Sequence, residues 1–293
     1  MMRALRRSLR SVAAASIAAL GGCLGGAIEP DAAATRIAPS SLDWSDWGLT
    51  LSRAVQGELV DYSAVMADPA PLNRCLAMVG RIGPRRTPEQ FPDDAGRLAY
   101  YINCYNATVM RSVIALAVDG KPPARAPWGL ENRFRFRIDD RWQSPADLRQ
   151  TALELAGDDW RARFALCDGR RGSPPLWRRP FLADLLDGQL GHVTREFLCA
   201  PQIVSIEHGE RKRLLLWRDL FAIKDRLVAE YERRLHTTDA TVVNALGLWS
   251  NRSRRLTLNS AIGYEVAALS FDDRINQIDP PPEESAGLLS GFK

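Results

Sequence analysis

The stretch Tyr100-Tyr101-Ile102-Asn103-Cys104-Tyr105-Asn106-Ala107 determines how the interior of this chain is organised. It lies in an apolar run with helical spacing and places two asparagines three residues apart, so both amides share one face of the predicted helix. A buried amide is costly unless it is hydrogen-bonded, and the pair therefore predicts a specific internal polar network. Two interpretations are open: the amides tie neighbouring loops to the helix, or they line a binding site.

Signals on both sides of this stretch delimit the neighbouring elements. Asp93-Asp94 favours a helix start, and Gly120-Lys121-Pro122-Pro123 ends that helix. Residues 133–138 alternate arginines with apolar side chains, which predicts a strand with its aromatics inward, and Asp139-Asp140 forms the following turn. Ser144-Pro145-Ala146-Asp147 is typical of a capped helix start.

The remaining pattern is mostly helical. We expect helices at 49–60, 71–79, 180–197 and 215–235, a short buried strand at 163–169, and a strand or short helix at 261–269. The pattern predicts one α+β domain over residues 41–278, mostly helical with a small antiparallel sheet. Beyond the N-terminus, no stretch is long and apolar enough to cross a membrane.

The N-terminus has the pattern of an export signal. Residues 1–22 carry four arginines and no acidic residue, followed by a short alanine-rich apolar run. Leu20-Gly21-Gly22-Cys23 is similar to a bacterial lipobox, which predicts cleavage before Cys23 and lipidation of its thiol. Cleavage near residues 32–34 without a lipid is the alternative. We expect residues 23–40 to form a flexible tether and residues 279–293 a disordered tail.

Removing the signal takes the net charge from +4 to 0, which argues against a nucleic-acid partner. The membrane, reached through the N-terminal lipid, is the first partner that we expect. The expected location is the periplasmic face of a membrane in the cell envelope, with a soluble periplasmic or secreted form as the alternative. An envelope location permits disulfides, and the four cysteines of the body allow three pairings: Cys75, Cys104, Cys167 and Cys199.

The histidines, His192, His208 and His236, are too widely separated for a zinc site, and no phosphate-binding or dinucleotide motif is present. We therefore expect neither a metal nor a cofactor. Cys104 is a poor candidate nucleophile, because it lies about three turns into its helix, where the helix dipole gives little help in lowering a thiol pKa.

The order of motifs resembles the family known as domain of unknown function 547. Residues 101–107 are similar to its "W-I-N-x-Y-N-A" core, and residues 144–150 stand where it carries "S-L-x-x-I-E-H". Residues 163–169 and 172–175 stand at its "H-F-A-L-N-C-G" and "S-C-P-P" motifs, and residues 271–276 at its "Y-D-W-x-L-N" element. The resemblance spans about residues 61–276. It invites comparison with papain- and transglutaminase-like enzymes.

The chain departs from this pattern at its reactive positions. The family's Glu-His pair is Arg149-Gln150, its histidine is Arg163, and its two cysteines are Asp168 and Ser173. The residues that shape the fold remain, while those suited to acid–base or thiol chemistry are exchanged. The resemblance therefore implies a non-catalytic relative with no catalytic residue, acting in binding or assembly, with another envelope protein as a possible partner. A cysteine-dependent hydrolase or acyl-transfer enzyme is the alternative.

A third interpretation starts from six arginines that crowd around the loop at the cysteine motif: Arg161, Arg163, Arg170, Arg171, Arg178 and Arg179. Guanidinium groups suit carboxylates and phosphates, so an open cleft here would bind an anionic ligand. The candidate ligand-binding residues are Asn103, Asn106, Arg149, Arg163 and Ser173. This hypothesis predicts that Arg163→Ala weakens binding and that Arg178→Ala does not. A solvated basic loop is the alternative.

Overall fold

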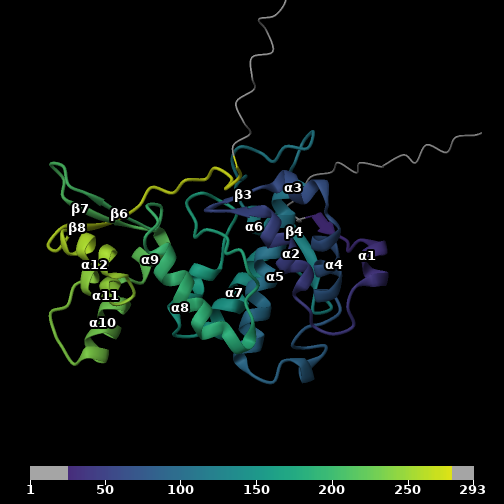
Figure 1. The fold of residues 1–293 in the computed structure, drawn as a ribbon, viewed down its shortest axis with the longest axis horizontal. Coiled ribbons are helices and arrows are strands. Elements are labelled where there is room, and N and C mark those ends of the chain that lie inside the picture. The colour runs from purple at the N-terminus through teal and green to yellow at the C-terminus, as the bar shows by residue number, and fades with distance from the viewer. Residues whose placement is uncertain (1–25, 279–293) are drawn as a thin grey trace, which may run out of the picture.

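The computed structural model describes residues 26–278. Its centre is helix α5 (Asp94–Ala115), which is buried on nearly all sides and is capped by the Asp93 carboxylate accepting from the Gly96 N–H at 2.7 Å. Helix α7 (Pro145–Ala156) packs along α5, and α4 (Ala70–Val79) packs on it as well (Figure 1). A helix enclosed in this way requires apolar residues around its circumference, and the run 98–113 provides them.

Smaller elements surround this centre. Helices α2 (Ser45–Ala54) and α3 (Tyr62–Ala67) flank the hairpin of β2 (Val55–Gln56) and β3 (Leu59–Val60). Strands β4 (Phe134–Ile138) and β5 (Arg141–Gln143) form the second hairpin, preceded by α6 (Leu130–Arg133). The first described strand, β1 (Gly26–Ile28), runs parallel to β4 and is followed by α1 (Ala32–Ile37).

The C-terminal part carries its own sheet and helices, at the left of Figure 1. Strands β6 (Val204–Glu207), β7 (Arg213–Leu216) and β8 (Glu265–Ala268) form the sheet, in which β7 and β8 are parallel. The helices, which sit beside this sheet, are α9 (Arg218–Ala222), α10 (Lys224–Leu235), α11 (Val242–Leu248) and α12 (Arg252–Asn259). After β8 the chain returns to the first part, where bridges join Arg170 to Ile275 and Val60 to Gln277.

The fold is α+β and mostly helical, as expected. The capped start at Ser144 is confirmed as a reciprocal capping box with Asp147, and the hairpin turns at Asp139-Asp140, where both residues have positive φ. The sheet differs from the expected antiparallel one, because β1 and β8 each add a parallel neighbour. None of the helices within residues 26–278 has the length and apolar character of a membrane span.

Several predicted boundaries require correction. The tether expected at 23–40 contains β1 and α1, because Gly26–Ile28 pairs with a strand more than a hundred residues away, which composition does not reveal. The helix expected at 49–60 ends at Ala54 in a hairpin, and the one at 215–235 is divided into β7, α9 and α10. The signal at 1–22 and the tail at 279–293 lie outside the described residues.

The strand expected at 163–169 is instead a 3-10 helix, Trp160–Ala165, followed by a loop. The helix expected at 180–197 is confirmed only in its second part. A 3-10 turn at Ala183–Leu185 precedes α8 (Leu186–Phe197).

Candidate functional site

The two asparagines of the opening stretch are fully buried in the core and bind main-chain groups. The Asn103 amide donates to the Phe181 carbonyl at 2.8 Å and accepts from the Phe181 N–H at 3.0 Å. The Asn106 amide donates to the Ala165 carbonyl at 2.8 Å and accepts from the Cys167 N–H at 3.1 Å. Each amide therefore holds a loop against α5, which is the geometry of the first of the two interpretations.

The loop held by Asn106 carries the residues at the family's cysteine positions, and they are buried. Ser173 donates to the Arg170 carbonyl at 2.9 Å and lies 3.8 Å from the Cys167 sulfur. The Cys167 sulfur also accepts from the Asn276 amide at 3.4 Å. Ser173 is thus part of an internal hydrogen-bonded cluster.

Asp168 lies on the same loop. Burial raises the pKa of its carboxyl, and the Arg170 guanidinium, 3.1 Å away, acts in the opposite direction. A carboxyl group whose pKa is raised by burial is one whose neutral form the fold stabilises relative to the charged form.

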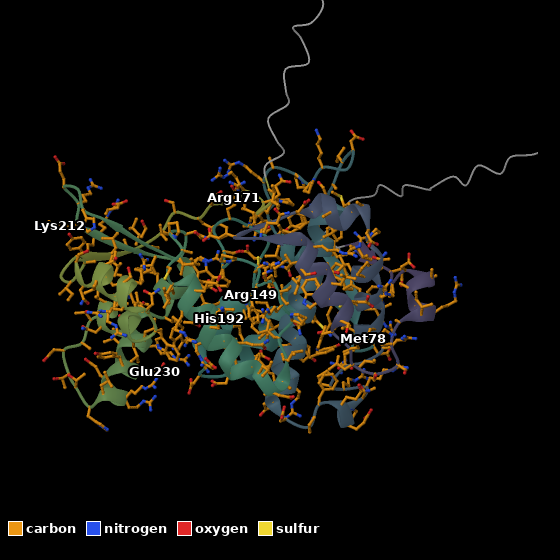
Figure 2. All side chains as sticks on the ribbon, in the orientation of Figure 1. Met78, Arg149, Arg171, His192, Lys212 and Glu230 are labelled. Carbon is orange, nitrogen blue, oxygen red and sulfur yellow. The ribbon has the colours of Figure 1, made fainter. Side chains whose placement is uncertain are left out.

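Arg149 and Arg163 meet at one carboxylate, that of Asp219 on α9. Arg149 forms an ion pair with Asp219 through Nη2, and the Arg163 Nη1 lies 3.7 Å from the same oxygen. The Asp219 side chain is only 11% exposed, so the structure does bring the two predicted arginines together but neutralises them with a buried acid. Figure 2 shows Arg149 near the middle of the molecule, where the two parts of the chain meet.

Charge and burial act differently on the two guanidinium groups. Burial works to lower the pKa of Arg149, but the negative charge of Asp219 and its other acidic neighbours outweighs burial and raises it. For Arg163, burial dominates and lowers the pKa, despite Asp219. In both cases burial is the largest single influence on the pKa, which indicates that both guanidinium groups are held inside the fold.

The surroundings of Arg149 are acidic. A hollow of about 380 Å³ beside it is lined by Glu131 and Glu154 together with Gln150 at the family's histidine position. The Glu131 carboxylate accepts from the Tyr105 hydroxyl at 2.7 Å. An anionic ligand would meet two carboxylates here, so this hollow does not fit the expected anion cleft.

The four cysteines of the body are all free thiols. Cys75, Cys104 and Cys167 are buried, and Cys199 is exposed. Burial raises the pKa of Cys167 to about 12 and that of Cys104 well above its ordinary value, so neither carries appreciable thiolate at neutral pH. In the part of the chain that the structure describes, no cysteine hydrogen-bonds to a histidine, and no cluster of residues is suited to a metal ion.

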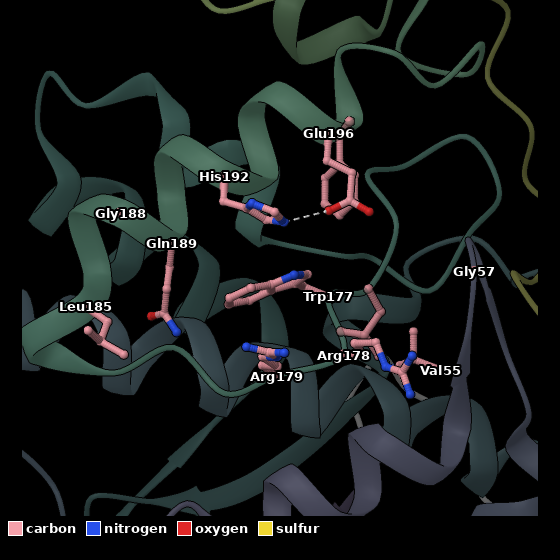
Figure 3. A pocket seen from close by; sticks show the side chains of 12 residues that line it. Val55, Gly57, Trp177, Arg178, Arg179, Leu185, Gly188, Gln189, His192 and Glu196 are labelled. Carbon is pink, nitrogen blue, oxygen red and sulfur yellow. Dashed lines mark ion pairs between the residues drawn. The ribbon is translucent and has the colours of Figure 1, made fainter. Parts of the chain in front are cut away.

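A groove of about 630 Å³ lies between α8 and the loop that follows Ser173. Figure 3 shows Trp177 lying between His192 on one side and two arginines on the other. The groove is lined by Val55, Gly57, Leu176, Trp177, Arg178, Arg179, Leu185, Gly188, Gln189, His192, Glu196 and Phe197. We call it the Trp177 groove.

The chemistry of the Trp177 groove is aromatic and cationic. The imidazole of His192 lies against Trp177 with ring centroids 5.9 Å apart and ring planes tilted by 43°, and its Nε2 lies 3.2 Å from the Glu196 carboxylate. Arg178 and Arg179 are exposed, and neither has an ion-pair partner among residues 26–278. An aromatic face beside two unpaired guanidinium groups fits a ligand that combines an anionic group with an apolar or planar part.

The structure changes which arginines are available. Arg163, which the sequence predicts to bind the anionic ligand, lies against the Asp219 carboxylate. Arg178, whose replacement is predicted to leave binding unchanged, lines the Trp177 groove. Sequence reasoning missed Trp177 and Asp219. Trp177 stands beside Arg178-Arg179 in the sequence, which is a usable signal, but nothing in the sequence connects Asp219 to Arg149.

These observations define a class: an α+β domain whose motif residues form an internal polar network and whose Trp177 groove is lined by aromatic, apolar and cationic side chains. Comparison with family models identifies the domain further. Residues 89–198 match the model described as "Protein of unknown function, DUF547", which is the family that the order of motifs predicts. The match includes Asn103, Asn106, Arg149, Arg163 and the Trp177 groove from Leu176 onward. Comparisons with curated proteins and with solved structures gave no match.

Proposed function

We propose that this chain is an exported, lipid-anchored protein of the cell envelope that acts by binding rather than by catalysis, and that the Trp177 groove takes an acidic ligand. The single observation that carries the proposal is the contrast between the two arginine sites. Arg149 and Arg163 are neutralised by Asp219, while Arg178 and Arg179 are unpaired beside the half-buried Trp177.

The case against catalysis rests on the thiols. A cysteine enzyme needs a thiolate with a nearby base, and the buried cysteines have raised pKa values and no histidine partner. The family's histidine and glutamate positions carry Arg163 and Arg149, which stay protonated at neutral pH and cannot accept a proton. Binding is the role that these residue types can still support.

The ligand class follows from the lining of the groove. Leu176, Leu185 and Phe197 give it apolar walls, and the two arginines lie along one side of Trp177. A carboxylate or phosphate could bind the guanidinium groups while a ring or acyl part packs on the indole. A small inorganic anion would leave the apolar part of the groove unused.

The probe 8-anilinonaphthalene-1-sulfonate has both features and tests this proposal. We expect Arg178→Gln combined with Arg179→Gln to weaken its binding roughly 5- to 30-fold, since each exposed charge pair contributes up to about 1 kcal/mol. Trp177→Ala should weaken it as well. The uncharged N-phenyl-1-naphthylamine should be affected by Trp177→Ala but not by the arginine changes.

A matched control is available on the β6–β7 loop, where Arg211 and Lys212 form another adjacent pair of exposed cations. Arg211→Gln with Lys212→Gln should leave sulfonate binding unchanged. Equal losses from the two double variants would reduce the effect to non-specific charge and refute a site in the Trp177 groove.

The lipid anchor is tested separately. The intact mass of the protein extracted from membranes should correspond to a chain beginning at Cys23 with added acyl groups. An N-terminus near residues 32–35 without acyl mass would remove the anchor from the proposal and leave the groove unaffected.

A further inference from the structure

The two most exposed large hydrophobic side chains in residues 26–278 lie on one loop. Trp128 is 98% exposed and Val118 is 72% exposed, and both belong to the connection between α5 and α6, residues 116–129. This connection, which we call the 116–129 loop, rises above α3 and β3 in Figure 1. A fully exposed tryptophan is unusual in a chain that buries most of its aromatic residues.

The 116–129 loop is held in a defined shape. At its tip, the N–H groups of Val118 and Lys121 each donate to the other's carbonyl at 3.0 Å, around Asp119 and Gly120 with φ of 51° and 73°. Positive φ at both central residues is the geometry of a type I′ turn, for which Asp-Gly is a favoured sequence. The tip therefore presents Val118 and Lys121 side by side.

The base of the loop is fastened to the returning C-terminal segment. The Ala126 N–H donates to the Asp273 carbonyl at 2.9 Å, and the Ile275 N–H donates to the Ala124 carbonyl at 3.0 Å. Arg125 forms an ion pair with Asp273. Trp128 is thus held out in solvent by a fixed backbone, without any packing of its own side chain.

We infer that the 116–129 loop inserts Trp128 and Val118 into the headgroup region of the membrane that carries the lipid anchor. This rests on the proposed lipidation of Cys23. Cys23 is three residues from Gly26, the first residue of β1, which limits the span between them to about 10 Å. The lipid therefore keeps β1 close to the bilayer surface.

The distance from β1 to Trp128 is short as well. Gly26 pairs with Phe134, and the intervening residues back to Trp128 include the helical turn α6. Chain geometry places Trp128 within about 20 Å of Gly26. An indole at that distance from the anchor can reach the interface, where tryptophan is favoured because its ring is apolar and its N–H can still hydrogen-bond.

The charges nearby suit an anionic bilayer. Lys121 and Arg133 are exposed, and neither is in an ion pair among the residues that the structure describes. Asp119 is the one exposed acid on the tip of the loop. These two cations, one at the tip of the loop and one on α6, add an electrostatic attraction to the apolar one.

The test uses the intact protein purified from membranes, with its acyl mass recorded, in vesicles of 3:1 phosphatidylcholine to phosphatidylglycerol. A fraction of the phosphatidylcholine carries bromine near the headgroup end of its acyl chains. The emission of Trp128 is obtained as the difference between the wild type and Trp128→Phe. We expect bromine to reduce this difference in emission at least twofold. We expect aqueous iodide to quench it less than it quenches Trp128 in the lipid-free Cys23→Ser protein, which serves as the control in detergent-free solution.

The lipid-free Cys23→Ser protein gives a second measurement. Its partition onto the same vesicles should fall about tenfold with Trp128→Ala and remain unchanged with Leu256→Ala, an exposed leucine on α12 that is 65% exposed. Trp128 has no packing to lose, so the variant should fold normally. Loss of a dimer by Trp128→Ala in solution would instead assign the loop to a second copy and overturn the inference.

The outcomes separate the two proposals. If the protein carries the acyl mass but bromine does not quench its Trp128 emission, the membrane contact is refuted and the lipid anchor is supported. A protein without acyl mass whose Trp128 emission is still quenched by bromine would refute the anchor and support the membrane contact.

Discussion

Replacing Asn106 by alanine tests the internal polar network most directly. The amide satisfies the Ala165 carbonyl and the Cys167 N–H, both in the interior beside α5. Alanine would leave both main-chain groups without a partner, at about 1–3 kcal/mol each, and would add a small cavity. We expect a total loss of about 3–5 kcal/mol in the free energy of unfolding, a large share of the 5–15 kcal/mol typical of a domain.

The assay is urea unfolding followed by far-ultraviolet circular dichroism, with the midpoint and the slope analysed together. Asn132→Ala is the matched control, because Asn132 is exposed on α6, and it should change the free energy of unfolding by less than about 0.5 kcal/mol. Asn106→Asp should also be destabilising, since a carboxylate keeps the acceptor for Cys167 but faces the Ala165 carbonyl with no donor. A loss below about 1 kcal/mol for Asn106→Ala at an unchanged slope would refute the structural role of the amide.

Three further predictions concern charge and thiols. Asp219→Asn should lower the free energy of unfolding by about 2 kcal/mol, discounted for partial exposure, because it removes the carboxylate that Arg149 and Arg163 share. Asp225→Asn, at an exposed pair, should have almost no effect in the same urea titration. The pKa of Asp168 is raised by burial, so the folded state binds its proton more tightly, and stability should fall as pH rises from 3.8 through that raised pKa. Asp168→Asn should remove this part of the pH dependence, and an identical pH profile for the two proteins would contradict the assignment. In the native protein, iodoacetamide should modify the exposed Cys199 and reach the three buried thiols only after unfolding. Rapid, pH-sensitive labelling of a buried thiol, read by peptide mass, would favour the enzyme alternative.

Local signals in the sequence predicted local structure well. The capping box at Ser144 and the turn at Asp139-Asp140 depend on residues that are close in the chain, and both are present. The amide pair of α5 was predicted to need partners, although the sequence did not name them. Their partners, Phe181 and Ala165, are 78 and 59 residues away.

Features that depend on distant pairing could not be predicted. The composition of residues 26–28 suits a linker, and only the free edge of β4 makes them a strand. The apolar run at Leu214-Leu215-Leu216 is compatible with a helix or a strand, and its pairing on both sides with β6 and β8 decides for the strand. Asp219 has no local feature that identifies it as the partner of Arg149.

The position of Asp219 links the altered motifs to the C-terminal part of the chain. Arg149 and Arg163 occupy the family's glutamate and histidine positions, and two guanidinium groups placed there with side chains only 28% and 26% exposed would repel each other. The compensating carboxylate comes from α9, which lies beyond the residues 89–198 that match the family model. The two arginines within residues 89–198 and the acid supplied by α9 therefore form one electrostatic unit. That unit occupies the positions at which the family carries its glutamate and histidine, and we propose the Trp177 groove, on α8 and the preceding loop, as the surface at which the domain recognises a ligand.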